Sequence, residues 1–516
     1  MWNERIQELQ SLRERAELGG GMERIEKQHS AGKMTARERI ACLLDEDSFV
    51  EINAFVESRI NDFGLESRRV PGDGVVTGYG KIDGRLVFVM AEDFTVIGGT
   101  LGEYHSWKIC QLQDMALNMM APIIMINDSG GARIEEGICS LSGYSGMFLR
   151  NTRASGVIPQ ISVIMGPCSG GACYSPAICD FIFMVKGTGN MFITGPKVVK
   201  TVINEEATIE ELGGADICHT KSGVAHFVYE TEQECLSGVR QLLYYLPDNN
   251  KKIHQQDLEH GVHQRDHSRK LQQIVPGNSK KPYDVKKVIK VIVDRGSFFE
   301  VQEGFAKNVV IGFARMDGKV TGIIANQPSV LSGSLDCDGS DKMARFIRFC
   351  DCFSIPLVTL IDVPAFFPGT EQEHRGIIRH GAKILYAYSE ATVPKISLIM
   401  RKAYGGAYIA MNSKNMGADI VYAWPIAEIA VMGAEGAVNI VFKKQIKSAA
   451  DSKKEETRLR KEYEDTFMNP YIAAKRGYVD EIIRPDETRQ KLLAALAMLR
   501  DKELQQPWKK HGNIPL

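Results

Sequence analysis

Short apolar runs alternate with longer amphipathic stretches along the first half of the chain. Each run is a few residues long and ends at Gly, Pro, Asn or Asp. This is typical of buried strands in a sheet whose two faces are both covered by helices. Helices are expected between the runs, at 105–120 and 142–155. The expected strands are residues 86–90, 122–126, 161–165 and 181–185.

The second half repeats this alternation, which again predicts an α/β arrangement. Before it, residues 248–284 are rich in Asn, Lys, Gln, His and Asp, so we expect a linker there. Residues 1–60 are charged and are expected to be helical, and residues 443–460 predict a helix with a solvated face. The strands expected in this half are residues 320–325, 357–362, 396–400, 420–423 and 429–432.

The two halves are related copies. The segment that starts Gly78-Tyr-Gly-Lys-Ile-Asp-Gly matches the one that starts Gly312-Phe-Ala-Arg-Met-Asp-Gly, 234 residues later. Ile158-Pro-Gln-Ile-Ser-Val-Ile-Met matches Val393-Pro-Lys-Ile-Ser-Leu-Ile-Met at an offset of 235. A period this long indicates two whole domains of one fold, whereas a solenoid repeats every 20–50 residues or so. Two copies suggest two related sites, and therefore a reaction with two partners.

Composition narrows the class of protein. The chain has 516 residues and a net charge of −1, which argues against nucleic acid as a partner. We find no apolar run long enough to span a membrane and no N-terminal signal peptide. The eleven cysteines include no CxxC pair, so a zinc ribbon is not expected. Free thiols in a cytoplasmic protein fit this pattern best.

Matched glycine pairs are the most informative local feature. Gly170 and Gly171 follow a predicted strand in the first copy, and Gly405 and Gly406 follow its counterpart 235 residues later. Without side chains, the backbone N–H groups at the start of the next helix can approach a ligand and stabilise negative charge. This predicts two oxyanion holes. The structural alternative is a pair of tight turns that allow close helix packing.

Other candidates for chemistry are weaker. Ser169 lacks the Gly-x-Ser-x-Gly context of a hydrolase nucleophile, and no histidine recurs in both copies. Asp128 and Asp362 end matched strands, and we favour capping of the following loop over a role as general base. The basic segment 27–37 is equally consistent with binding phosphates and with a solvated helix start.

Several longer motifs identify a resemblance. The first half contains Asn127-Asp-Ser-Gly-Gly-Ala-Arg and Gly166-Pro-Cys-Ser-Gly-Gly-Ala, and the second contains Arg401-Lys-Ala-Tyr-Gly-Gly-Ala-Tyr and Ala430-Val-Met-Gly-Ala-Glu-Gly-Ala. In this order they resemble the biotin-dependent acyl-CoA carboxyltransferases, from about residue 20 onward. The resemblance covers the propionyl-CoA carboxylase β type, the methylmalonyl-CoA decarboxylase α type and the transcarboxylase large subunit.

This family implies an α/β fold of tandem duplicated crotonase-like (ClpP/crotonase) ββα superhelix domains. Residues 1–260 would form the acyl-CoA side and residues 261–516 the biotin side. The family also implies a homo-hexamer whose active site joins the first half of one subunit to the second half of its dimer partner. Biotin would arrive on a separate carrier protein, since no Ala-Met-Lys-Met biotinylation motif is present. Biotin carboxylase or membrane decarboxylase subunits are the implied partners.

The resemblance also assigns residues. Gly170 and Gly171 would stabilise the enolate of the thioester, and Gly406 and Ala407 would hold the biotin carbonyl, without a metal. The residues implied to bind the substrates are Gly130, Gly131, Ala132, Ser169, Ala172, Ala365, Phe366, Tyr404, Gly405 and Ile409.

Two positions depart from the family pattern. Ala365 stands where many relatives have Gly, which adds a Cβ in a tight loop. Ile409 stands where some propionyl-specific relatives have Asp, so acetyl-, propionyl- and methylmalonyl-CoA all remain candidates.

We expect a carboxyltransferase that acts on propionyl-CoA and methylmalonyl-CoA, in a direction set by its partners. The alternatives are a crotonase-fold hydratase or thioesterase without biotin, and a scaffold subunit that only holds a biotinylated partner.

Overall fold

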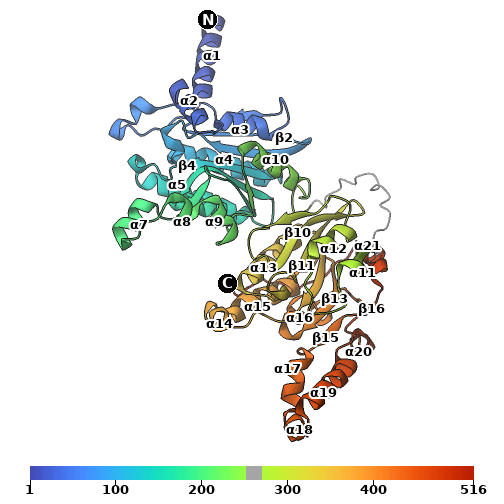
Figure 1. The fold of residues 1–516 in the computed structure, drawn as a ribbon. Coiled ribbons are helices and arrows are strands. Elements are labelled where there is room, and N and C mark those ends of the chain that lie inside the picture. The colour runs from blue at the N-terminus through green and yellow to red at the C-terminus, as the bar shows by residue number, and fades with distance from the viewer. Residues whose placement is uncertain (252–269) are drawn as a thin grey trace. The chain divides into compact units, whose positions relative to one another are not determined.

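The computed structural model describes residues 1–251 and 270–516. The chain divides into two compact units, Met1–His254 and Gln255–Leu516, each built around its own eight-stranded sheet (Figure 1). The predicted domain boundary between residues 260 and 261 lies outside the described residues. The linker was predicted to extend to residue 284. Helix α11 (Leu271–Ile274) already belongs to the second unit, because Leu271 is buried in its core.

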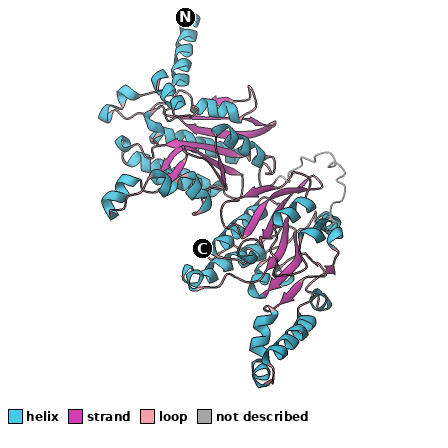
Figure 2. Cartoon of the chain, in the orientation of Figure 1, coloured by secondary structure: helices cyan, strands magenta, loops and turns pink. Residues whose placement is uncertain are grey.

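The sheet of the first unit has the order β1-β2-β3-β4-β5-β6-β8, and β7 pairs with β5. Figure 2 shows the strands in magenta and the helices around them in cyan. Strands β1 to β3 pair in antiparallel fashion and the remaining neighbours are parallel. Every residue of β4 is buried, so both faces of the sheet are covered. The strands are β1 Val50–Ile52, β2 Val75–Ile82, β3 Arg85–Glu92, β4 Ile123–Ser129, β5 Gln160–Ser169, β6 Phe181–Val185, β7 Asn190–Phe192 and β8 Phe227–Tyr229.

The second unit repeats this topology in the order β9-β10-β11-β12-β13-β14-β16, and β15 pairs with β13 as β7 pairs with β5. All strands predicted from the apolar runs are present. The strands are β9 Phe299–Val301, β10 Val309–Met316, β11 Lys319–Asn326, β12 Leu357–Val363, β13 Lys395–Tyr404, β14 Ile420–Ala423, β15 Glu428–Ala430 and β16 Glu481–Ile482.

Helices connect and cover the strands. Both helices predicted in the first half, α4 (Glu103–Met119) and α5 (Ile138–Ala154), are present, and they pack against each other. Their counterparts α13 (Cys337–Cys352) and α15 (Ile377–Glu390) do the same in the second unit. The other helices of the first unit are α1 Trp2–Leu18, α2 Met22–Ser30, α3 Ala36–Leu43, α6 Tyr174–Ile178, α7 Pro196–Ile203, α8 Ile209–Gly213, α9 Ala215–Thr220 and α10 Glu232–Leu243.

The charged helix predicted at 443–460 is in fact two helices. Helix α18 (Lys443–Ser448) ends before the Asp451 side chain accepts the Lys454 N–H and caps α19 (Ser452–Phe467). Leu459 packs into a small cluster with Val438 and Ile446, while most charged residues of this region are exposed, as the predicted solvated face requires. The remaining helices of this unit are α12 Val285–Ile292, α14 Thr370–Arg375, α16 Gly405–Ala410, α17 Ala434–Val441, α20 Pro470–Lys475 and α21 Thr488–Met498.

The duplication extends beyond the segments that match in sequence. The Asp45 carboxylate pairs with Arg240 and accepts two backbone N–H groups from the β2–β3 turn. In the second unit, Asp294 pairs with Arg489 and accepts two N–H groups from the β10–β11 turn. Both ion-paired residues are shifted by 249, so the flanking elements are duplicated with an offset different from that of the core.

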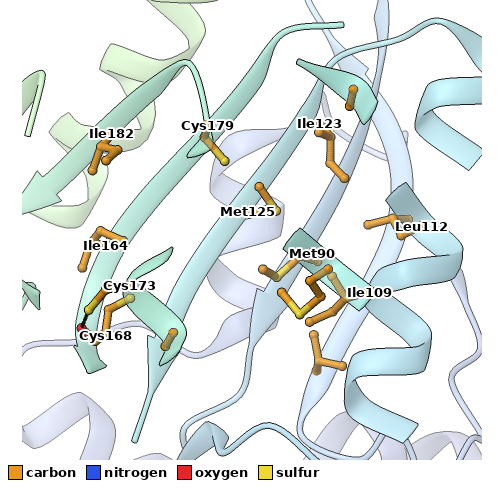
Figure 3. Close-up of a cluster of buried hydrophobic side chains, with 14 of the residues drawn as sticks. Met90, Ile109, Leu112, Ile123, Met125, Ile164, Cys168, Cys173, Cys179 and Ile182 are labelled. Atoms are coloured by element: carbon orange, nitrogen blue, oxygen red, sulfur yellow. Dashed lines mark hydrogen bonds between the residues drawn. The ribbon is translucent and has the colours of Figure 1, made fainter. Parts of the chain in front are cut away.

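The core of the first unit lies between the sheet and helices α4 and α5. Figure 3 shows Ile109 and Leu112 of α4 beside Met90, Ile123 and Met125 of the central strands. Cys168 and Cys173 lie together at the end of β5 in the same cluster. The site described next therefore begins where β5, buried from residue 160 to 166, leaves the core.

In the two described ranges, no helix is both long enough and apolar enough to cross a membrane.

Candidate active site

The first glycine pair lies where β5 ends. Strand β5 continues through Ser169, four residues past its predicted end, and a short 3-10 helix (Gly170–Cys173) then leads into α6. Gly170 has a φ of 62°, in the left-handed region that favours glycine. A Cβ on Gly171 would lie 3.4 Å from the ring of Tyr144 on α5, so this ring forms the floor beneath the turn.

The second pair repeats this geometry. Strand β13 runs through Tyr404, Gly405 has a φ of 57°, and Gly405 begins α16. A Cβ on Gly405 would lie 3.0 Å from the Val431 carbonyl oxygen, whereas a Cβ on Gly406 would meet no atom within 4 Å. Because the first N–H groups of a helix have no intrahelical acceptor, each turn presents donors at its glycine pair. We call these two turns the first and second cradle.

The loop after β4 lies beside the first cradle. Ser129 on β4 pairs with Cys168 on β5, and the bond between the Gly131 N–H and the Ser129 hydroxyl turns the chain back. A Cβ on Gly131 would lie 3.2 Å from the Ser169 carbonyl oxygen. Ala132 pairs with Leu101 in an isolated bridge. The structure therefore brings Gly131, and with it the loop at 130–132, next to Ser169 at the start of the first cradle.

The loop after β12 has the same place in the second unit. Val363 pairs with Ala403 near the end of β13, and Phe366 pairs with Leu335. The Leu335 N–H donates to the Ala365 carbonyl, and the Phe366 ring packs on Gly381 of α15. Ala365 has no positive φ, so its Cβ is accommodated without strain.

The remaining predicted residues divide by exposure. Ala172 and Ala407 are buried within the turns, which leaves their backbone groups as the parts that can contact a ligand. Ile409 is 46% exposed on α16, where its side chain can contact a ligand or another subunit.

The matched aspartates do not cap the following loops as predicted. Asp128 is fully buried and pairs with Lys33 at 2.6 Å and with Arg39 at 2.8 Å. Asp362 is also fully buried and pairs with Arg401 at 2.9 Å. Burial opposes ionisation and raises the pKa of Asp362, while Arg401 acts in the opposite direction. Because both carboxylates bind buried cations, neither is placed as a free general base.

Two basic side chains of the segment 27–37, Lys33 and Arg37, pair with carboxylates of the first unit. The Lys33 side chain is almost fully buried against Asp128, and burial lowers the pKa of Lys33. Arg37 pairs with Glu51 at 2.7 Å. At these two positions neither a solvated helix start nor a phosphate site describes the segment, because their charges are neutralised by internal carboxylates.

Sequence reasoning missed a matched pair of acceptors behind the aspartates. Glu92 on β3 accepts the Asp128 N–H at 2.9 Å, and Asn326 on β11 accepts the Asp362 N–H at 3.2 Å. Glu92 and Asn326 are 234 residues apart, so the repeat offset itself was the signal. Burial raises the pKa of Glu92 to about 8. The described residues contain no group of three His, Cys, Asp or Glu side chains suited to a metal ion.

Comparison with known proteins identifies the family. The model of the carboxyl transferase domain matches residues 27–514. The chain belongs to the carboxyl transferase family. It is 56% identical to the carboxyltransferase subunit of propionyl-CoA carboxylase from Haloferax mediterranei, over 99% of both chains. It is 55% identical to the methylmalonyl-CoA decarboxylase subunit alpha of Veillonella parvula, again over 99% of both.

A solved structure is also similar to this carboxyl transferase over nearly its whole length. The transcarboxylase 12S structure, described as a hexamer with methylmalonyl-coenzyme A and methylmalonic acid bound, has a TM-score of 0.97 and 52% identity. The match covers 99% of this chain and 98% of that one. The expected fold of two crotonase-like domains is thus confirmed, as is the family resemblance.

Proposed function

We propose that this protein moves a carboxyl group between biotin and the α-carbon of propionyl-CoA or methylmalonyl-CoA. The observation that carries the proposal is the pair of matched cradles, each ending a buried strand with a left-handed glycine. Relatives named for both acyl-CoA compounds share more than half of its residues. The direction of transfer is set by the partner proteins, since the same site serves carboxylases, decarboxylases and transcarboxylases.

The cradles fit the two groups that such a reaction requires. A thioester carbonyl and the biotin carbonyl each need N–H donors where negative charge develops, and a backbone without a Cβ lets them approach. Gly170 and Gly171 are assigned to the thioester oxygen, and Gly406 and Ala407 to the biotin oxygen. Biotin, when bound, supplies the carrier for the carboxyl group. The open space over Gly406 fits a ligand at that position.

Side chains play a positioning part in this proposal. Asp128 and Asp362 are neutralised by buried cations, so they hold the strand ends in place and do not remove a proton. Ser169 and the loop at 130–132 are assigned to the acyl-CoA side, and Tyr404, Ile409 and the loop at 365–366 to the biotin side. Catalysis then rests on orientation and on electrostatic stabilisation by fixed dipoles.

The proposal includes partners and assembly. Biotin is expected on a separate carrier protein, together with biotin carboxylase or membrane decarboxylase subunits, in the cytoplasm. By analogy with the hexamer of the transcarboxylase, we expect six chains of 57.3 kDa in one particle. Light scattering of the purified protein measures this mass directly.

Turnover of methylmalonyl-CoA with free biotin as acceptor tests the function. We expect formation of propionyl-CoA that depends on biotin concentration and saturates with it. Loss of methylmalonyl-CoA at the same rate without biotin, with free CoA released in place of propionyl-CoA, would instead support a thioesterase. A protein that binds a biotinylated carrier but yields no product would be a scaffold.

A further inference from the structure

The strand that borders each cradle differs between the two copies. Strand β15 pairs with β13 so that Glu428 lies opposite Lys402, and β7 pairs with β5 so that Asn190 lies opposite Pro167. The core offset would have matched Glu428 to residue 193, so only the strand register shows which residues correspond. The second cradle therefore has two charged side chains where the first has an amide and a proline.

Glu428 binds a residue of the cradle itself. The Tyr404 hydroxyl donates a hydrogen bond to the Glu428 carboxylate. Tyr404 immediately precedes Gly405, and its first-copy counterpart is Ser169, whose side chain is too short to reach β7 in this way. Burial is the main factor that raises the pKa of Tyr404, and Glu428 raises it further, so the hydroxyl keeps its proton.

The Tyr404 ring also lies near the turn before α17. A Cβ on Gly433, which precedes α17, would lie 3.7 Å from the ring of Tyr404. Lys402 reaches the Ser332 carbonyl at 3.4 Å and lies 3.9 Å from Asp362. Tyr404 is thus bound by one carboxylate and lies near a backbone turn, and both it and Glu428 are only partly buried.

We propose that Glu428 is a positioning residue of the second cradle. Its carboxylate fixes the Tyr404 ring as a rigid wall beside the Gly406 and Ala407 N–H groups, and this wall orients the biotin ring. The inference rests on the proposed function, because it concerns the group that the second cradle binds. The first copy lacks this pair, as expected if the first cradle binds a different ligand.

The test uses the full-length protein with methylmalonyl-CoA and free biotin. The variants are Glu428→Ala, Glu428→Gln, Tyr404→Phe and the double variant Tyr404→Phe/Glu428→Ala. Glu462→Ala, on the exposed face of α19, is the matched control. The Michaelis constants for biotin and for methylmalonyl-CoA are measured separately, and thermal unfolding verifies that each variant folds.

A hydrogen bond to a charged group is worth roughly a tenfold change in affinity or more. We therefore expect Glu428→Ala and Tyr404→Phe each to raise KM for biotin about tenfold while leaving KM for methylmalonyl-CoA unchanged. The double variant should be no worse than either single one, because both remove the same bond. Glu428→Gln should recover most of the loss, since an amide oxygen also accepts the Tyr404 proton.

Hydrogen exchange provides a readout without biotin. The amides of residues 404–408 should exchange faster in Glu428→Ala than in the parent and the control. Additive effects in the double variant, an equal rise in both Michaelis constants, or unchanged exchange and kinetics would overturn the proposal. A parent protein without biotin-dependent turnover would contradict the proposed function instead, so the two failures are distinguishable.

Discussion

At the scale of single residues, glycines in the cradles serve two separate purposes. Gly170 and Gly405 are glycines because their φ angles are positive. Gly171 and Gly406 have no such requirement, and Gly406 has open space where a side chain would be. Glycine at 406 is therefore explained by what must approach it rather than by the fold.

Replacement of Gly405 by Ala tests this division. We expect it to lower the free energy of unfolding by roughly 1–3 kcal/mol. Alanine would be strained at a φ of 57°, and its Cβ would lie 3.0 Å from the Val431 carbonyl oxygen. Gly406→Ala is the matched control and should keep or slightly raise stability, since Ala is the better helix residue. Denaturant unfolding of the two variants compares them directly. Equal losses would contradict the division.

Glu92 predicts a pH dependence of stability. Its native pKa of about 8 lies above the ordinary value of 4.5, so between these values the native protein holds a proton that the unfolded chain has released. The stability contributed by this group is fully present below about pH 4.5 and is lost as pH rises through about 8. Glu92→Gln should remove this pH dependence, which for a pKa difference of about 3.5 is on the order of 5 kcal/mol.

The Gln side chain keeps an acceptor for the Asp128 N–H, as Asn326 does for Asp362 in the other copy. The measurement is the free energy of unfolding of both proteins at pH 5, 7 and 9. Parallel curves for Glu92→Gln and the parent would show that Glu92 does not hold a proton in the native state.

At this scale, the sequence predicts features that depend on neighbouring residues and misses those that depend on distant ones. The glycine pairs were predictable, because a positive φ and a strand-to-helix turn are local properties. The role of Asp128 was not, since its partners Lys33 and Arg39 are about 90–95 positions away and lie on other elements. An aspartate at a strand end suggests a cap unless the distant cations are known.

At the scale of elements, every strand predicted from an apolar run is present in the structure. The runs did not predict where the two longest strands, β5 and β13, end. Strands β5 and β13 continue into segments that begin Gly166-Pro and Arg401-Lys, which look like turns. Pairing with β7 and β15 keeps these segments extended. Strands β7 and β15 are short and follow the turns in sequence. The apolar run of β5 or β13 therefore contains no sign of the strand that extends it.

In each unit, one buried lysine forms hydrogen bonds that link a helix to the start of a strand. Lys108 of α4 donates to the carbonyls of Gly72 and Val75, before and at the start of β2. Lys342 of α13 donates to the corresponding carbonyl of Val309 at 2.8 Å and also to that of Phe305 at 2.7 Å. Each lysine therefore supplies hydrogen bonds to backbone carbonyls next to the start of a strand.

Lys342→Met should destabilise the protein by roughly 3 kcal/mol, because it leaves several buried carbonyls without a donor. Lys290→Met on the exposed side of α12 is the control and should have little effect. Urea unfolding followed by circular dichroism gives both values. A loss below about 0.5 kcal/mol for Lys342→Met would show that the lysine is not a fastening element.

At the scale of the whole molecule, the duplication links sequence, fold and function. The constant offset of 234–235 was visible in the sequence and predicted two domains of one fold. The flanking elements, shifted by 249, were not recognised because only Asp45, Arg240 and a few neighbours are kept there. The main difference between the copies is the Tyr404–Glu428 pair, which is present in the second copy. It lies at the cradle, where two different ligands would require different side chains.

The central claim is that each copy cradles one carbonyl oxygen, the thioester in the first and biotin in the second. The most direct test compares Gly171→Ala with Gly406→Ala, because neither position requires a positive φ. Both proteins should fold and both should lose roughly 10²–10³-fold of biotin-dependent turnover of methylmalonyl-CoA. The Michaelis constant for biotin should rise only in Gly406→Ala, and that for methylmalonyl-CoA only in Gly171→Ala. Full turnover by a folded Gly406→Ala protein would contradict the claim.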